Sequence, residues 1–193
     1  MSLADEIAGA FAPGADETIP AEKVRGWMRS EDLEALGAIA AALWRDEDVA
    51  RIRPALDWDE VFRFLLQYYA RCFRENLPLD GRRAHSRYQA GWAVASWFAA
   101  LWDDASIPRQ RLLQMKNWLA ALYREGDDGL RLCIETATLE HLFERAAIAV
   151  WFEDWLSDPL LGPAHVRALD WGRNQGRPPG RPRPKKRGQR GKR

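Results

Sequence analysis

Hydrophobic residues recur every three or four positions through most of the chain, which is the spacing that gathers them on one face of an α-helix. No segment alternates β-branched and polar residues as a half-buried strand does. We therefore predict an all-α fold, a single multi-helix bundle of about seven or eight helices with short connections. Sequential helices of such a bundle pack roughly antiparallel.

Capping residues divide the first half of this pattern into helices. A short helix is expected near the N-terminus, and Pro20 is placed as the first-turn proline of the next one. Ser30 is expected to cap a third helix. Asp57, with Glu60 three positions later, forms a capping-box pattern in front of a long amphipathic helix.

The second half continues in the same way. Residues 83–102 are apolar on more than one face, which predicts the central helix of the bundle. Pro108 is expected to begin the next helix, and Asp127 or Asp128 to cap its successor. Residues 148–156 carry another helical stripe, after which a last helix is expected to end at Gly172.

Charge separates the chain into two parts. Residues 172–193 contain ten Lys or Arg, five Gly, four Pro and three amides, and no acidic, aliphatic or aromatic residue. Such a segment has nothing to bury, so we expect a disordered basic tail. Residues 1–171 hold all 28 acidic residues against 19 basic ones, a net charge of −9. We interpret them as one acidic globular domain.

A short motif in the tail carries the clearest functional signal. Gly180, Arg181 and Pro182 are followed by further basic residues, and this segment resembles the AT-hook, a motif with a Gly-Arg-Pro core that lies in the minor groove of A·T-rich DNA. Pro179 and Pro184 stand where that motif usually has basic flanks. The resemblance implies nucleic-acid contacts by the following residues: Arg177, Gly180, Arg181, Pro182, Arg183, Lys185, Lys186 and Arg187.

Other interpretations of the tail remain open. A polybasic segment binds RNA, DNA or any polyanion through counterion release, without choosing a sequence. The same charge could serve solubility, an acidic protein partner, or contact with the acidic body of this chain.

A second basic group is expected on the body. Arg71 and Arg74 are three positions apart on one helix face, and more basic residues follow around Gly81. Together they form a candidate anion patch: Arg71, Arg74, Arg82, Arg83 and Arg87. The alternative is a solvated face whose arginines pair with helix acids.

The pattern does not point to catalysis. Glu140 and Glu144 share a helix face near His141, but the Glu-x-x-His order of helical di-iron sites is absent. The sequence has neither a nucleophile elbow nor a phosphate-binding glycine loop. We expect no metal and no cofactor, and leave open an enzyme with a site inside the bundle. The tryptophans are expected mainly in the core, with Trp58 and Trp171 exposed.

The function class follows from the partition of charge. We expect a nucleic-acid-associated accessory protein whose tail contacts DNA or RNA and whose acidic body mediates protein interaction. The alternative is a protein-binding module in which the tail is incidental. No uncharged run is long enough to cross a bilayer, and the acidic first residues do not resemble a secretory signal. The expected location is the cytoplasm, with nucleoid association if the tail binds DNA.

Overall fold

The computed structural model describes residues 1–12, 14, 17–77 and 86–175, which form an almost entirely helical protein. The all-α prediction is therefore confirmed for the part of the chain that the structure describes. The first half contains the following elements: α1 (Leu3–Ala10), β1 (Ile19–Pro20), α2 (Ala21–Met28), α3 (Leu33–Leu43), α4 (Asp46–Val49), β2 (Ile52–Arg53) and α5 (Trp58–Glu75).

The second half has only helical secondary-structure elements in its described residues. It contains these elements: α6 (Arg87–Asp103), α7 (Arg109–Glu125), α8 (Asp128–Cys133), the π-helical turn η1 (Ile134–Leu139), α9 (Glu140–Phe143), α10 (Ala146–Trp151), the 3₁₀ helix η2 (Glu153–Ser157) and α11 (Leu161–Gln175). The segments α8, η1 and α9 run on without a break, so they replace one predicted helix. The count exceeds the seven or eight expected because several pieces, such as α4, are about one turn long.

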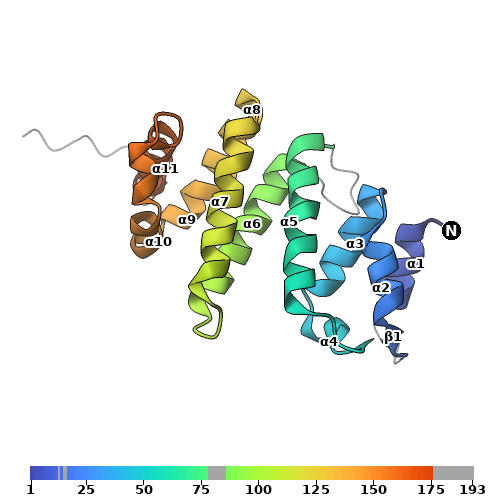
Figure 1. Cartoon of the computed structure of the whole chain (residues 1–193). Helices are drawn as coiled ribbons and strands as arrows, with labels where there is room; N and C mark the ends of the chain where they lie inside the picture. The colour runs from blue at the N-terminus through green and yellow to red at the C-terminus, as the bar shows by residue number, and fades with distance from the viewer. Residues whose placement is uncertain (13, 15–16, 78–85, 176–193) are drawn as a thin grey trace, which may run out of the picture.

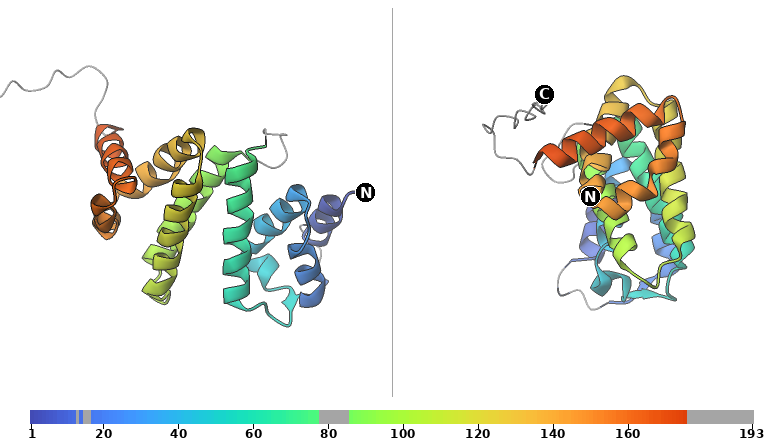
Figure 2. Two further views of the ribbon diagram at one scale, coloured as in Figure 1. Left: turned by 45° about the horizontal axis from the view of Figure 1, so that its top comes forward. Right: turned by 90° about the vertical axis from the view of Figure 1, so that its left-hand side faces the viewer.

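The helices follow one another across the molecule in chain order (Figure 1). Helix α1 lies at one end and α11 at the other, and the turned views show the same progression (Figure 2). The main packing partners agree with this order: α1 packs on α3, α3 on α5, α5 on α6, α6 on η1, and η1 on α11. The bundle is thus drawn out along its length, with α1 and α11 at opposite ends.

The helices begin where short polar side chains satisfy free backbone N–H groups. Asp57 caps α5 by accepting from the N–H of Asp59, and Asp127 caps α8 by accepting from the N–H of Leu130, as predicted. Glu60 does not complete the expected capping box, because its carboxylate pairs with Arg25 at 2.9 Å. Two predicted starts are wrong by a few residues. Asp32, rather than Ser30, caps α3.

The other displaced start belongs to α6, which begins at Arg87 instead of residue 83. Ser86 caps it by accepting from the N–H of Gln89. Arg82 and Arg83, which the prediction assigned to this helix or its entry, lie outside the described residues. The short pairing of β1 with β2 was also not predicted: Ile19 and Ile52 are parallel partners that tie the segment before α2 to the segment before α5.

The core is strongly aromatic, as the ten tryptophans suggested. Trp97 on α6 is buried and its ring centroid lies 5.2 Å from that of Phe62 on α5. Further along, Phe98 contacts Phe152 at 5.7 Å and links α6 to the C-terminal helices. Each such side chain removes a large apolar area from water, so these contacts hold successive helices together.

The predicted helix over 148–156 divides at Phe152, and a buried cation explains the break. Lys116 on α7 donates to the backbone carbonyl oxygen of Trp151 at 2.7 Å and pairs with the carboxylate of Asp154. That carbonyl is thereby withdrawn from the helical hydrogen-bond ladder. The chain leaves α10 and continues as η2.

Helix α11 runs to Gln175, three residues beyond the predicted end at Gly172, so residues 172–175 continue a helix instead of opening the tail. A single glycine costs a helix only about 1 kcal/mol, so Gly172 does not by itself end α11. Within the described ranges, no helix combines the length and the apolar character that a membrane span requires.

Candidate interaction surfaces

The predicted nucleic-acid contacts, from Arg177 to Arg187, lie outside the described residues. The structure does describe the helix to which they are attached. Because α11 is at the end of the molecule opposite α1, the basic segment is joined to the body at that end (Figure 2).

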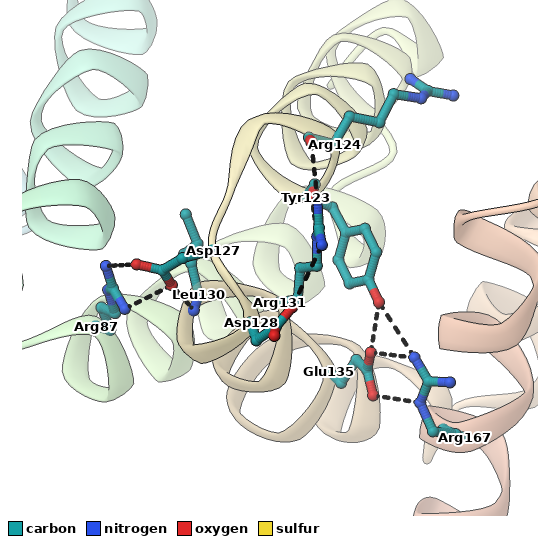
Figure 3. A network of polar contacts seen from close by, with 9 residues as sticks. All are labelled: Arg87, Tyr123, Arg124, Asp127, Asp128, Leu130, Arg131, Glu135 and Arg167. Carbon is teal, nitrogen blue, oxygen red and sulfur yellow. Dashed lines mark hydrogen bonds and ion pairs between the residues drawn. The ribbon is translucent and has the colours of Figure 1, made fainter.

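A polar network fastens α11 to the body (Figure 3). Glu135 on η1 is buried, and Arg167 on α11 donates to its two carboxylate oxygens at 2.8 and 2.6 Å. Tyr123 on α7 donates its hydroxyl to the same carboxylate at 2.6 Å, and Arg167 also donates to the tyrosine oxygen at 3.2 Å. Three elements far apart in sequence therefore meet at one carboxylate.

The electrostatics of this network favour a neutral tyrosine and a charged arginine. Burial, and then the hydrogen bond to the Glu135 carboxylate, raise the pKa of Tyr123 to about 12. The same carboxylate raises the pKa of Arg167 above its ordinary value. The arrangement is that of a structural ion pair with its hydrogen bonds satisfied.

The π-helical turn that carries Glu135 also lies close against α6. A Cβ atom added to Gly91 on α6 would lie 2.6 Å from the Cβ of Ala137. Thr138 donates its hydroxyl to the carbonyl oxygen of Gly91 at 3.2 Å. The wide turn of η1 thus presents small side chains to α6 and a carboxylate to α11.

The predicted anion patch is only partly brought together. Arg71 and Arg74 line a cleft of about 500 Å³ between α5 and α7, together with Trp118 and Glu125. Both guanidiniums have acidic partners: Arg71 pairs with Glu75 at 2.6 Å, and Arg74 pairs with Glu125 at 3.0 Å. This is the arrangement that the alternative interpretation anticipated, although such exposed pairs are weak enough to exchange partners.

Arg87 has a different position from the rest of the patch. It donates to both carboxylate oxygens of Asp127 at 2.9 Å (Figure 3). It also donates to the carbonyl oxygen of Phe73 at 2.7 Å. Its guanidinium lowers the pKa of Asp127. Arg87 therefore joins the C-terminal end of α5 and the N-terminal end of α6 to the start of α8. Its positive charge is paired with the carboxylate of Asp127. Arg82 and Arg83 lie outside the described residues.

The two carboxylates considered as metal ligands, Glu140 and Glu144, have different surroundings. Glu140 is buried, whereas Glu144 is exposed and contacts His141 at 3.3 Å. Among the described residues, no group of three or more His, Cys, Asp or Glu is placed to hold a metal ion.

Two hollows on one side of the molecule meet at Ser96 on α6, and we call them together the alanine-rich groove. The first hollow has a volume of about 400 Å³ and the second about 430 Å³. The first is lined by Gly37, Ala40, Ala41 and Trp44 of α3, Tyr68, Tyr69 and Cys72 of α5, and Gln89, Ala90, Ala93 and Ser96 of α6. The second is lined by Trp92, Ala95, Ser96 and Ala99 of α6 and His141 of α9.

The composition of this groove differs from that of the chain. Charged residues make up 30% of the sequence, yet the described residues that line the groove include no Asp, Glu, Lys or Arg. Its floor is made of small side chains, which allow close approach of another backbone. Partly exposed aromatic rings stand beside it: Trp44 is 43% exposed and Trp92 is 46% exposed.

The two exposed aromatics are held differently. Trp44 donates its indole N–H to the hydroxyl of Tyr69 at 3.0 Å and packs edge-on against Trp97. Trp92 contacts Tyr88 one turn earlier, with ring centroids 6.4 Å apart, and Tyr88 is itself exposed. Trp44 is thus held in place at one side of the first hollow, and Trp92 projects from α6.

The prediction for the tryptophans is therefore correct in part. Trp97 and Trp155 are buried, and Trp58 and Trp171 are exposed, as predicted. Trp44 and Trp92 were expected in the core and are exposed instead. The available signal was the row of small or polar residues Gln89, Ala93 and Ser96 on α6, because such a row at helical spacing leaves one face unfilled.

Comparisons with protein-family models, with curated proteins and with solved structures find no match for this chain. The function is therefore inferred from the charge partition and from the surfaces described above.

Proposed function

We propose that this protein is a nucleic-acid-associated accessory protein, in which the basic C-terminal tail contacts DNA or RNA and the helical body contacts protein. The observation that carries the proposal is the separation of charge: ten basic and no acidic residues in 172–193, against a net charge of −9 in 1–171. A phosphate backbone attracts the first part and repels the second.

The attachment of the tail supports this division of roles. Arg167 secures α11 to Glu135, so the helix that leads into the basic segment is fixed to the body. The three described arginines of the predicted anion patch, Arg71, Arg74 and Arg87, are each paired with an acid, which favours the tail as the main source of affinity for phosphate. The cytoplasm, or the nucleoid when DNA is bound, is the location consistent with this proposal.

Binding to A·T-rich and G·C-rich duplexes over a salt series tests the role of the tail. We expect the full chain to bind, with log affinity falling against log salt by about 0.9 for each phosphate neutralised. A chain that ends at Gln175 keeps the whole of α11 and should lose this binding. Its circular dichroism and melting temperature would show that the body remains folded. Equal binding by the two chains would contradict the proposal.

A matched pair of variants distinguishes the AT-hook from a general polyanion contact. Arg181→Ala and Arg190→Ala each remove one positive charge from the tail, but only Arg181 belongs to the Gly-Arg-Pro core. An AT-hook predicts that Arg181→Ala abolishes the A·T preference and Arg190→Ala retains it. A general contact predicts equal, small losses and no preference in the parent chain. Competition with single-stranded RNA would separate the DNA and RNA cases.

A second candidate function is favoured by the alanine-rich groove. An uncharged hollow floored by alanine fits a protein surface better than phosphate or the basic tail. In this case the body alone is the working part, and the tail is incidental. Retention of the same protein partner by the chain ending at Gln175, in nuclease-treated extract, would support it.

A further inference from the structure

The alanine-rich groove has properties that identify what can occupy it. The described residues that line it include no Lys or Arg, so it offers no permanent positive charge to a phosphate. The basic tail of the same chain is also a poor occupant, because residues 172–193 contain no aliphatic or aromatic side chain. The occupant must instead present an uncharged, partly apolar surface.

The groove itself presents such a surface. Trp92 projects from α6 with 46% of its surface exposed, and Ala93 and Ser96 on the same helix line the adjacent hollow. A projecting ring beside a hollow is complementary to a second copy of itself turned by a two-fold axis. In that arrangement each Trp92 enters the partner's first hollow.

Charge favours a second copy at this place over other faces of the body. Two bodies of net charge −9 repel one another in general. The described residues that line the groove include no Asp or Glu. Two copies that meet at the groove therefore bring no groove-lining carboxylates close to one another. Small residues at Ala93 and Ala99 also allow the two α6 helices to approach closely.

We propose that the alanine-rich groove is a homodimer interface, in which α6 packs against α6 of a second copy and Trp92 of each protomer fills the hollow beside Ala93 of the other. The groove is small compared with the roughly 20–30 residues that each side of a standard interface contributes. We therefore expect a weak dimer, with a dissociation constant on the order of micromolar.

Sedimentation of the full chain at concentrations from about 1 to 300 μM tests the proposal without nucleic acid, so its outcome is independent of the role of the tail. We expect a shift from monomer to dimer over this range. Ala93→Glu places a charge in the hollow, and Trp92→Ala removes the projecting ring. Each should weaken the dimer by about tenfold or more.

Val166→Glu is the matched control, because Val166 is exposed on α11 and does not line the groove. It adds the same charge as Ala93→Glu and should leave dimerisation unchanged. Circular dichroism and melting temperature of each variant would show that a monomer is a folded one. A parent chain that stays monomeric at every concentration overturns the proposal, and so does a dimer that Ala93→Glu and Trp92→Ala leave intact.

Discussion

Arg167 on α11 and Glu135 on the π-helical turn form a two-pronged ion pair that joins residues 32 positions apart. The carboxylate is buried, whereas about half of the arginine side chain remains exposed. The geometry is therefore that of an anion kept inside the protein by one cation at its edge and by the hydroxyl of Tyr123. Removing the cation leaves a buried charge without its main partner.

Arg167→Ala should accordingly destabilise the fold. Hydrogen bonds to charged groups contribute more than neutral ones, and we expect a loss of about 2 kcal/mol in the free energy of unfolding. Urea titration followed by circular dichroism measures it. Glu75→Gln, which breaks the exposed pair with Arg71 within α5, is the control and should cost only about 0.3 kcal/mol. Equal losses in the free energy of unfolding of the two variants would show that the buried carboxylate of Glu135 is not stabilised by Arg167.

The phenol of Tyr123 should lose its proton at a higher pH than an ordinary tyrosine. Its pKa is raised to about 12 by burial and by the neighbouring carboxylate, against about 10 in an unfolded chain. The stability from the neutral phenol is therefore complete below pH 10 and is lost as the pH rises through 12. The absorbance at 295 nm of the parent chain minus that of Tyr123→Phe should show a midpoint near 12. A midpoint near the ordinary value of about 10 would place the phenol in water.

Gly91→Ala should weaken the contact between α6 and η1. The added methyl group would meet the Cβ of Ala137 at 2.6 Å, which forces the two helices apart. We expect a loss of about 1–3 kcal/mol despite the better helix propensity of alanine. Gly26→Ala is the matched control in α2, because an added Cβ there meets nothing within 4 Å. It should stabilise the protein by about 0.5–1 kcal/mol, and thermal unfolding would compare the two.

Both cysteines should react slowly in the folded protein. Cys72 and Cys133 are buried, and burial raises the pKa of their thiols to about 11 and about 12. Little thiolate is present at pH 8, and the reagent has no access. A colorimetric thiol reagent should modify neither residue within minutes in buffer and both in denaturing urea. Rapid modification without urea would show that these sites open readily.

The sequence was sufficient for features that depend on neighbouring residues. Helix class and the caps at Asp57 and Asp127 follow from short patterns in the sequence. The error at Ser30 has the same local origin, since Ser30 and Asp32 are both good capping residues two positions apart.

Features that depend on residues distant in the sequence could not be predicted from such short patterns. The division of the helix at Phe152 depends on Lys116, which lies on α7 and withdraws the carbonyl of Trp151. The exposure of Trp92 depends on which face of α6 is left uncovered by α3, α5 and α9. The tail was identified from composition alone, and its proposed role remains a prediction from charge and from the resemblance to the AT-hook.

The order of the helices has a consequence for how the chain acquires its structure. Because the main packing partners are close in sequence, most contacts close short loops, and folds of this kind form in about microseconds to milliseconds. Each helix also finds its earlier partner already made as the chain emerges from the ribosome. Tyr123 and Glu135 precede Arg167 in the chain, so we expect α11 to dock last, on a surface that the earlier elements have already formed.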